Sequence, residues 1–397
     1  MPENSALRVL CLDIEGGYGG SSRSLYESIR HLDTANTAAE VWCRRQGPIQ
    51  HRYQAIGVTA RVTPAMPRFS ALPRLSRNVY AAARAALEFR RAGAFLKDLQ
   101  GAAACFDAVH FNHEALFPTA RWLRRRTNRP LTMHIRTNLL DTPFARFQIR
   151  SISETMDHLV FITENEAETF RRLGGRPRAA SVIYNIVDVP TASPPPHPAV
   201  PSDERFKIAC LSNYSHARGL DRLVDVADAL AKRGRRVLFV MAGQMALTGS
   251  MPGLLGELGR RGGSLADFAA ARGRSEMFQF LGHVPEPESV LAACDALAKP
   301  TRENNPWGRD TLEALALGKP VLTCGRYSVF VEDGVTGVLQ PEFDAERLAD
   351  SIMRLDDNRA LALQMGEAGR ARVRTLCDGH ARAADLRAVW EAKRKAA

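Results

Sequence analysis

Residues 7–20 read LRVLCLDIEGGYGG, and this stretch decides the fold. Its apolar run from Leu7 to Ile14 is typical of a buried strand. Glycines follow the run, and a predicted helix comes next, with Leu25 and Ile29 among its evenly spaced apolar residues. A strand, a glycine loop and a helix in this order predict the start of a parallel α/β unit.

The second half of the chain begins in the same way. Residues 206–219, FKIACLSNYSHARG, give another strand run, a polar turn and a helix start. Between the halves, six prolines fall within residues 190–201, where neither a helix nor a central strand can continue. We therefore predict an α/β protein with two Rossmann-like domains that face each other across a cleft.

The predicted organisation has four parts. These are a first domain over 1–190, a Pro-rich linker over 191–204, a second domain over 205–379, and a C-terminal helix over 380–397 that packs back on the first domain. Further strands are predicted at 108–111, 131–135, 159–163, 181–184, 237–242, 278–281, 296–298 and 321–323. Residues 247–275 are helix or loop, and their pattern does not decide between the two.

Charge and cysteine content narrow the class of protein. The chain has 397 residues and a net charge of +11, and residues 51–150 hold 17 Lys and Arg against 5 Asp and Glu. An excess made mostly of Arg favours phosphate, carboxylate or anionic-surface partners, although solvated Arg-rich helices are an equal alternative. Seven scattered cysteines without Cys-x-x-Cys spacing fit a reduced, cytoplasmic protein. We expect no signal peptide and no transmembrane helix, because the apolar runs are too short.

A second informative stretch is residues 300–320, PTRENNPWGRDTLEALALGKP. A loop rich in Pro and Gly precedes a predicted helix from Arg309 to Leu317, so Gly308 stands where free backbone N–H groups can hold a phosphate. Glu313 lies one turn further on, where a carboxylate can accept hydrogen bonds from a ribose diol. The plainer interpretation is an ordinary helix start with a solvated Glu–Arg pair.

This stretch resembles the signature of the family-4 (group 1) retaining glycosyltransferases, which have the GT-B fold. Glu313 matches the second Glu of that signature, and the following Ala, Gly and Pro residues are in register. Residues 185–188 (NIVD), 280–284 (FLGHV) and 332–337 (EDGVTG) also resemble family segments, in the same order.

The resemblance implies a nucleotide-sugar site. Its catalytic candidates are His134, Asn305, Glu313 and Arg218. Its donor-binding candidates are Gly19, Gly20, Asn213, Arg218, Gly282, His283, Val284, Thr301, Trp307, Gly308, Arg309 and Glu313.

Two positions depart from the family pattern. Asn305 stands where the family has its first Glu, so that negative charge is lost unless Glu303 replaces it. Asn213 stands where the family has a basic residue, which leaves Arg218 as one of two diphosphate cations. Arg309 is a candidate for the missing one.

In the first domain, polar residues follow two predicted strands. His134 matches a family position beside the reacting sugar, where a histidine can hydrogen-bond the donor sugar or the acceptor and hold a charge near neutral pH. A satisfied histidine at a strand end is the alternative. Asn112, His113, Arg136 and Asn138 are candidate acceptor contacts, weighed against a solvated loop.

The resulting hypothesis is a retaining hexosyltransferase that moves a sugar from a UDP- or GDP-linked donor to a glycan or lipid-linked acceptor. We expect no cofactor and no metal, since the chain lacks an Asp-x-Asp pair. Alternatives are a nucleotide-binding protein with decayed transfer activity, a nucleotide-sugar epimerase or phosphorylase, and an NADP-linked oxidoreductase.

The Arg-rich surface within residues 68–129 is a candidate membrane contact. Arg84 and Arg91 are seven residues apart and share a helix face with Arg77. Arg121, Arg124, Arg125, Arg126 and Arg129 form a second group. We expect peripheral contact with an anionic membrane in polysaccharide biosynthesis, and no nucleic-acid binding, since aromatic residues are sparse among these arginines.

Overall fold

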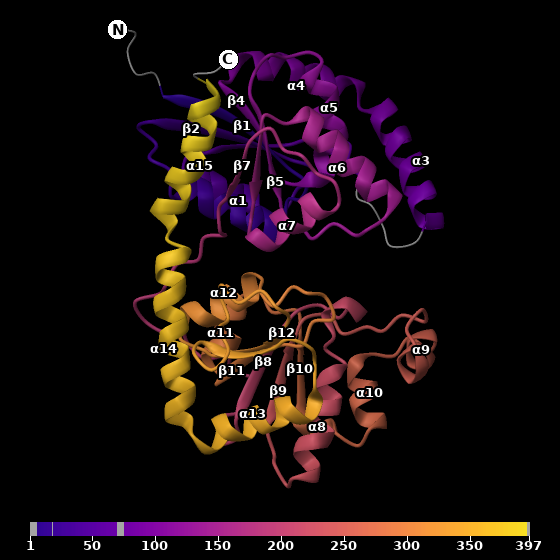
Figure 1. Ribbon diagram of the computed structural model, residues 1–397, viewed down its shortest axis with the longest axis vertical. Helices are drawn as coiled ribbons and strands as arrows, with labels where there is room; N and C mark the ends of the chain where they lie inside the picture. The colour runs from indigo at the N-terminus through magenta and orange to yellow at the C-terminus, as the bar shows by residue number, and fades with distance from the viewer. Residues whose placement is uncertain (1–5, 18, 70–74, 395–397) are drawn as a thin grey trace. The chain divides into compact units, whose positions relative to one another are not determined.

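The structure is a computed structural model that describes residues 6–17, 19–69 and 75–394. It divides into two compact units (Figure 1). Unit 1 comprises residues 1–186 and 377–397, and unit 2 comprises residues 187–376. The division therefore falls a few residues before the Pro-rich segment. That segment lies with unit 2, where the His197 amide donates to the Ser289 carbonyl oxygen over 2.9 Å.

Unit 1 is built on a seven-stranded sheet of parallel strands in the order β3-β2-β1-β4-β5-β6-β7. Its strands are β1 (Leu7–Asp13), β2 (Thr37–Cys43), β3 (Thr59–Val62), β4 (Ala108–Phe111), β5 (Leu131–Ile135), β6 (His158–Phe161) and β7 (Ala180–Val182). Its central strands β1, β4 and β5 are mostly apolar and buried, because both faces of the sheet are covered there.

Two separate cores cover the faces of this sheet. On one face pack α4 (Gly93–Cys105), α5 (Phe117–Arg124) and α6 (Pro143–Thr155). On the other lie α1 (Gly20–Arg30), α2 (Ile49–Ala55) and the C-terminal α15 (Gly379–Arg394), which contacts α1 and β4 (Figure 1). The remaining helices of unit 1 are α3 (Leu75–Arg91), the short 3₁₀ helix η1 (Glu114–Leu116) and α7 (Glu164–Arg172).

Unit 2 has a six-stranded parallel sheet in the order β10-β9-β8-β11-β12-β13. Its strands are β8 (Lys207–Leu211), β9 (Leu238–Ala242), β10 (Phe278–Gly282), β11 (Ala296–Lys299), β12 (Val321–Cys324) and β13 (Gly337–Gln340). Its helices are η2 (His216–Arg218), α8 (Arg222–Lys232), α9 (Gly253–Arg260), α10 (Leu265–Ala271), η3 (Ser275–Met277), α11 (Pro287–Ala292), α12 (Arg309–Ala316), α13 (Ala345–Asp357) and α14 (Arg359–Leu376).

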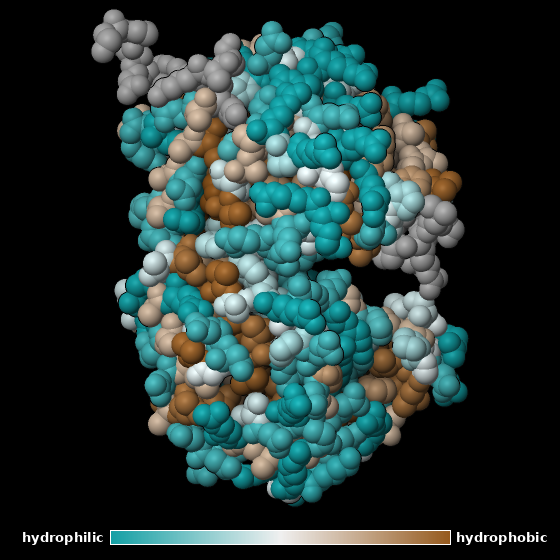
Figure 2. Space-filling view, viewed as in Figure 1, coloured by the Kyte–Doolittle hydropathy of each residue, from teal (hydrophilic) through white to brown (hydrophobic). Residues whose placement is uncertain are grey.

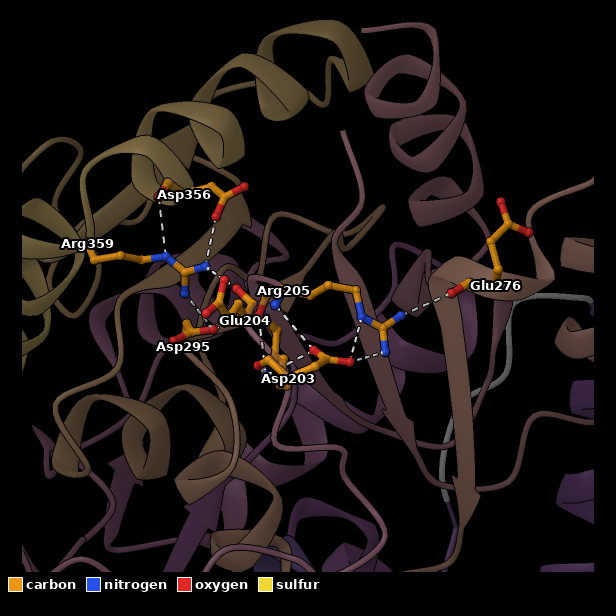
Figure 3. A network of polar contacts seen from close by, with 8 residues as sticks. Asp203, Glu204, Arg205, Glu276, Asp295, Asp356 and Arg359 are labelled. Carbon is orange, nitrogen blue, oxygen red and sulfur yellow. Dashed lines mark hydrogen bonds and ion pairs between the residues drawn. The ribbon is translucent and has the colours of Figure 1, made fainter. Parts of the chain in front are cut away.

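A polar network ties α14 to the start of the central strand β8 (Figure 3). Arg359 pairs with Asp295 at 3.0 Å and with Asp356 at 2.8 Å. The Asp295 carboxylate in turn accepts from the Lys207 amide, and Arg205 bridges Asp203 to the Glu276 carbonyl oxygen. These contacts lie at the amino ends of β8 and β11, which leaves the carboxyl ends of the strands to the longer loops.

The parallel α/β prediction is confirmed. All eight further strands predicted are present, with bounds that shift by a residue or two, and residues 247–275 contain α9 and α10. The strands β2, β3 and β13 were not predicted. In the described ranges, no helix combines the length and apolarity that crossing a bilayer requires.

Strand order gives each unit one place suited to a ligand. In unit 1 the chain leaves β1 toward β2 and later returns to β4 on the other side of β1, and in unit 2 the same happens at β8, between β9 and β11. Loops diverge at such a point, so a crevice opens beyond the carboxyl ends of the two strands. The loops after β1, β4, β8 and β11 carry most of the predicted site residues.

Candidate active site

In unit 2 the loops after β8 and β11 lie against each other. The Arg302 amide donates to the Ala217 carbonyl oxygen over 2.8 Å, and the Thr301 hydroxyl donates to the same oxygen over 3.3 Å. Gly219, at φ +69°, has no room for a side chain because a Cβ there would lie 2.1 Å from the Pro300 carbonyl oxygen. Predicted residues from two separate motifs, Arg218 and Thr301, are therefore neighbours across the strand-order reversal.

The loops after the outer strands join the same edge of the sheet. The Gly243 amide, after β9, donates to the Gly282 carbonyl oxygen over 2.6 Å. The Arg326 amide, after β12, donates to the Asn304 side-chain oxygen over 2.7 Å. Gly282 and His283 are exposed, and Val284 is half-buried. The predicted donor residues of unit 2 therefore share the carboxyl edge of one sheet.

Helix α12 begins at this edge without a side-chain cap. Gly308 is its N-cap residue and has no side chain to cap the helix, while Asp310 Oδ1 accepts from the Thr311 amide over 3.0 Å. Lys299 comes from the end of β11, and its Nζ lies 2.9 Å from Asp310 Oδ1. Backbone donors, the positive end of the helix dipole and a lysine are arranged as an anion site requires.

Glu313 and Arg309 lie one turn apart on α12. Glu313 is 5% exposed, and the Arg309 guanidinium stands 3.9 Å from its carboxylate. The side chains of Arg309 and Glu313 are 12% and 6% exposed. They are therefore not the solvated Glu–Arg pair of the plainer interpretation. A buried carboxylate with one cationic neighbour can accept hydrogen bonds from a diol.

Three polar atoms around the start of α12 are buried without a hydrogen-bond partner in the described residues. They are Asn305 Oδ1, Trp307 Nε1 and Thr311 Oγ1. Most buried polar groups in proteins are paired, so a group of such atoms needs an explanation. A polar ligand at this edge would supply the partners. Glu303 is exposed, which makes Asn305 the side chain of the pair that turns inward.

The two residues predicted for the diphosphate are placed differently. Arg218 is exposed, and its guanidinium donates to the Ser212 hydroxyl over 2.5 Å. Asn213 uses its side-chain oxygen to accept from the Gln244 amide over 2.9 Å, which fixes the loop after β9. Arg218 is therefore available to an anion, whereas Asn213 has a structural contact.

In unit 1 the acceptor candidates Asn112 and Arg136 belong to one network at the β1–β4 reversal. Asn112 donates to Asp13 Oδ1 over 2.9 Å and to the Ser21 carbonyl oxygen over 3.1 Å. Arg136 donates to the Asn112 backbone oxygen over 2.8 Å and to the Asn185 side chain over 3.2 Å. Both side chains thus hold the ends of β1, β4 and β5 together.

The other first-domain candidates lie close by. Gly20 begins α1, and Gly19 is its N-cap residue, again without a side-chain cap. His113 Nδ1 accepts from the Ala115 amide over 3.1 Å and caps η1. Asn138 Oδ1 is buried and has no hydrogen-bond partner among the described residues, so it retains an acceptor for a ligand.

His134 lies in β5 and is 3% exposed. Its Nδ1 is 2.8 Å from Nε2 of His110, the corresponding histidine of β4. Burial, followed by Arg136 and His110, lowers the pKa of His134 well below its ordinary value. The expectation that His134 holds a charge near neutral pH is therefore wrong, because the ring is neutral there and acts only through hydrogen bonds.

Sequence comparison decides the family. The sequence model described as "Glycosyl transferases group 1" matches residues 197–372, and the one described as "Glycosyl transferase 4-like domain" matches residues 19–185. The chain belongs to the group 1 glycosyltransferases of the GT-B fold. The matched ranges contain every site residue that the sequence predicted.

Curated relatives match only part of this glycosyltransferase. The D-inositol 3-phosphate glycosyltransferase of Saccharomonospora viridis is 28% identical over 278 residues, which cover 63% of the chain and 62% of the relative. A GDP-mannose-dependent alpha-(1-6)-phosphatidylinositol monomannoside mannosyltransferase of Mycobacterium tuberculosis is 28% identical, over 57% of the chain and 60% of the relative. The alpha-D-kanosaminyltransferase of Streptomyces kanamyceticus is 26% identical, and the match spans 42% of the chain and 40% of that relative.

Solved structures agree with the fold over nearly the whole glycosyltransferase. Anabaena Alr3699/HepE, crystallised with UDP and glucose, has a TM-score of 0.74 at 19% identity and covers 97% of the chain and 99% of its own. Sucrose-phosphate synthase from Thermosynechococcus elongatus has a TM-score of 0.74 at 16% identity, covering 98% and 100%. At these identities the likeness shows the GT-B fold alone.

The sequence did not single out four residues of these networks. Asp13 ends β1 and accepts from Asn112, while Lys299 ends β11 and pairs with Asp310. A charged residue at the carboxyl end of an apolar strand run was the signal that would have found both. Trp390 of α15 donates to His110 Nδ1 over 3.3 Å, and nothing in the sequence pairs these two residues, which are 280 apart.

Proposed function

We propose that this glycosyltransferase transfers a hexose from a nucleoside-diphosphate sugar to an acceptor hydroxyl, with retention of anomeric configuration. Family membership supports the class of reaction. The observation that carries the donor site is a group of buried polar atoms without a hydrogen-bond partner among the described residues, at Asn305, Trp307 and Thr311, beside Gly308 at the start of α12. A nucleotide sugar bound there would satisfy these atoms.

The donor would lie along the carboxyl edge of the unit 2 sheet. Glu313 would accept from the ribose hydroxyls, and the backbone N–H groups after Gly308 would hold the diphosphate together with Arg218. Residues 282–284 would border the base. The names of the relatives and the ligands of similar structures include both GDP-mannose and UDP, so a UDP- or GDP-linked donor is proposed.

In the reaction the acceptor hydroxyl oxygen attacks the anomeric carbon as the bond from that carbon to the phosphate oxygen breaks. Attack on the face that the phosphate leaves gives retention, and a phosphate oxygen accepts the hydroxyl proton. Charge on the departing diphosphate is stabilised by Arg218, the α12 N-terminus and the nearby Lys299. We propose that these groups stabilise the diphosphate charge without a metal ion.

The acceptor is proposed to be a glycan or a lipid-linked saccharide bound over unit 1. Helix α3 supports peripheral membrane contact, because Val79, Tyr80 and Leu87 are 60%, 73% and 45% exposed beside exposed Arg84 and Arg91. In Figure 2, brown apolar atoms adjoin teal polar ones on the right flank, where Figure 1 draws α3.

Not every arginine of the Arg-rich surface is available to a membrane. Residues 70–74, and the side chain of Arg77, lie outside the described residues. Arg124 is committed to Asp157 at 2.6 Å, and Arg129 donates to the Ala104 carbonyl oxygen over 3.0 Å. Arg121 and Arg125 are exposed. We propose a cytoplasmic protein that meets the membrane through α3 and these exposed arginines.

The test is an incubation of the full chain with UDP-glucose, UDP-galactose, UDP-N-acetylglucosamine and GDP-mannose, each with simple glycan and lipid-linked acceptors. Proton NMR of the product reports the configuration of the new bond. We expect an α-linked product from one of these α-linked donors, in the presence of a chelator as well as Mg²⁺.

Other outcomes separate the alternatives. A β-linked product contradicts retention, and loss of turnover in the chelator contradicts metal independence. Nucleotide binding without transfer or donor hydrolysis indicates a nucleotide-binding protein that has lost transfer activity. The departures from the family pattern at Asn305 and Asn213 are the reason for this alternative. Release of a sugar epimer or a sugar phosphate indicates an epimerase or a phosphorylase.

A further inference from the structure

The C-terminal helix inserts a tryptophan beside the two buried histidines of the unit 1 sheet. Trp390 is fully buried, and its Nε1 lies 3.3 Å from Nδ1 of His110. Nε2 of His110 lies 2.8 Å from Nδ1 of His134, with the two rings at 88° to each other. Trp390, His110 and His134 therefore form a continuous chain from α15 through β4 to β5.

The described neighbours of this chain are mostly apolar, although the Thr132 hydroxyl contacts His110 and the charge of Arg136 acts on both rings. His110 and Thr132 are partners in the β4–β5 register, and Thr132 Oγ1 is 2.8 Å from His110 Nδ1. The buried neighbours on this face of the sheet include Leu386 of α15, Val160 of β6 and Cys11 of β1, the register partner of His110. Burying three polar side chains in the core costs free energy unless each of their hydrogen-bonding groups has a partner.

The chemistry of the indole group sets the direction of every hydrogen bond in the chain. An indole N–H only donates, so Nδ1 of His110 must accept and carries no proton. The neutral ring then bears its proton on Nε2 and donates it to Nδ1 of His134. His134 must in turn bear its own proton on Nε2.

Both rings are neutral at physiological pH. Burial and Arg136 lower the pKa of His110 to about 3, and they lower that of His134 well below its ordinary value. The two histidines therefore have one tautomer each rather than a shared extra proton. Without Trp390, the opposite pair of tautomers would satisfy the His110–His134 contact equally well.

We propose that Trp390, acting through His110, fixes His134 in its Nε2–H tautomer, so that His134 presents a hydrogen-bond donor to a substrate hydroxyl. Trp390 and His110 are positioning residues, and His134 is the group that would touch the substrate. The substrate contact rests on the proposed function, whereas the tautomer is a property of the free protein. Trp390 lies in α15, a helix of unit 1 that follows unit 2 in the sequence.

The tautomer is tested directly by ¹⁵N NMR of the full chain with ¹⁵N-labelled histidine. A His134→Gln spectrum identifies the His134 signals by difference. In the wild type we expect separate protonated Nε2 and unprotonated Nδ1 shifts that do not change between pH 6 and 8. In Trp390→Phe, which keeps an aromatic ring but loses the N–H, we expect the two shifts to move toward each other.

Leu386→Val is the matched control, because it also loses volume from the same face of α15 without touching a hydrogen bond. It should leave the His134 shifts unchanged, and the melting temperatures of both variants report any general loosening. Unchanged shifts in Trp390→Phe, or an Nδ1–H tautomer in the wild type, would overturn the proposal.

Kinetics test the consequence for transfer. Loss of one neutral hydrogen bond corresponds to a factor of about five to ten, which we expect as a fall in kcat with the donor KM unchanged in Trp390→Phe. His110→Gln should retain most of kcat, since an amide can accept from Trp390 and donate to His134, whereas His110→Leu should not. If the tautomers mix and kcat is unchanged, the positioning role is wrong while the donor site stands.

Discussion

At the residue scale, Asn305 marks where this chain departs from its family. Its side-chain oxygen is buried without a partner in the described residues, eight positions before Glu313 and just ahead of the helix that would hold the diphosphate. An amide can accept from or donate to a sugar hydroxyl but adds no charge at the reacting carbon. We therefore propose that Asn305 acts in the transfer step rather than in nucleotide binding.

Asn305→Ala is accordingly expected to lower kcat about tenfold, because one or two hydrogen bonds to the sugar are lost. Its affinity for the free nucleoside diphosphate should be unchanged. Steady-state kinetics and calorimetric titration of the diphosphate measure the two effects separately. Glu303→Ala, two residues away and exposed, is the control and should change neither. A loss of diphosphate affinity in Asn305→Ala would place the residue in the nucleotide site instead.

Glu166 of α7 gives a prediction about pH. The side chain is 2% exposed, and burial, partly opposed by a hydrogen bond from Thr163, raises its pKa from 4.5 to about 7. Between these values the folded protein keeps a proton that the unfolded chain has released. The free energy of unfolding therefore falls as pH rises through this range, by about 3 kcal/mol for this group alone.

Glu166→Gln removes this titration. Urea unfolding of both proteins from pH 5 to pH 8 should show the wild type losing about 2.5 kcal/mol more stability than the variant. Parallel pH profiles for the two proteins would contradict the raised pKa.

Residues of the donor side could be predicted because each lies in a short motif. Glu313 and Gly308 are five residues apart, and local spacing alone places them at one helix start. The Trp390–His110 contact joins residues 280 apart and depends on which face of the sheet α15 covers. The sequence places His110 in a predicted strand and Trp390 in a predicted helix. It does not show that the two side chains are in contact, because that depends on tertiary packing.

At the element scale, the junction between α12 and α14 depends on close approach of backbone. Gly366 of α14 faces the C-terminal end of α12, where a Cβ would lie 1.8 Å from the Gly318 carbonyl oxygen. Gly318 itself has φ +68° and ends the helix that carries Glu313. A side chain at residue 366 would push α14 from α12 and displace the donor helix.

Gly366→Ala is therefore expected to lower the free energy of unfolding of unit 2 by about 3 kcal/mol, the cost of overpacking a site that cannot relax. Gly101→Ala, in the middle of α4 of unit 1 with no atom within 4 Å of its Cβ, is the contrast. It should raise stability by about 0.5–1 kcal/mol through helix propensity. Denaturant unfolding monitored by circular dichroism compares the two, and equal effects would contradict the packing argument.

The elements that the sequence predicted are those with continuous apolar runs, such as β1 and β8. The unpredicted β2 alternates small, charged and aromatic residues, and its pairing with β1 through all seven residues makes it a strand. β3 (TARV) and β13 (GVLQ) lack a continuous apolar run, and they form the sheet edges because a neighbouring strand offers them partners. Tertiary pairing, rather than local pattern, decides such short strands.

For the whole molecule, the excess positive charge lies in unit 1, within residues 51–150, and helix α3 exposes apolar side chains among its arginines. An anionic membrane would attract the arginines, and Val79, Tyr80 and Leu87 would enter its interface. The excess charge therefore belongs to unit 1, whereas the proposed donor site belongs to unit 2.

We expect the protein to sediment with phosphatidylglycerol vesicles at low salt and not with phosphatidylcholine vesicles. Reversing Arg84, Arg90 and Arg91 to Glu should weaken this binding about 100-fold or more, at about 1 kcal/mol for each arginine near the surface. Arg326→Glu, in unit 2 with 74% of its side chain exposed, is the control and should bind as the wild type does. Binding that is insensitive to salt, or lost equally in the control, contradicts an α3 contact.

The central claim is that a nucleoside diphosphate sugar binds at the start of α12, with Glu313 on its ribose. Calorimetric titration of UDP and GDP into the wild type, Glu313→Ala and Glu342→Ala tests it most directly, because Glu342 is an exposed carboxylate of the same unit. We expect the wild type and Glu342→Ala to bind one of the two nucleotides equally, and Glu313→Ala to bind it about 100-fold more weakly with a nearly unchanged melting temperature. Equal affinity in Glu313→Ala, or no binding of either nucleotide to the wild type, would contradict it.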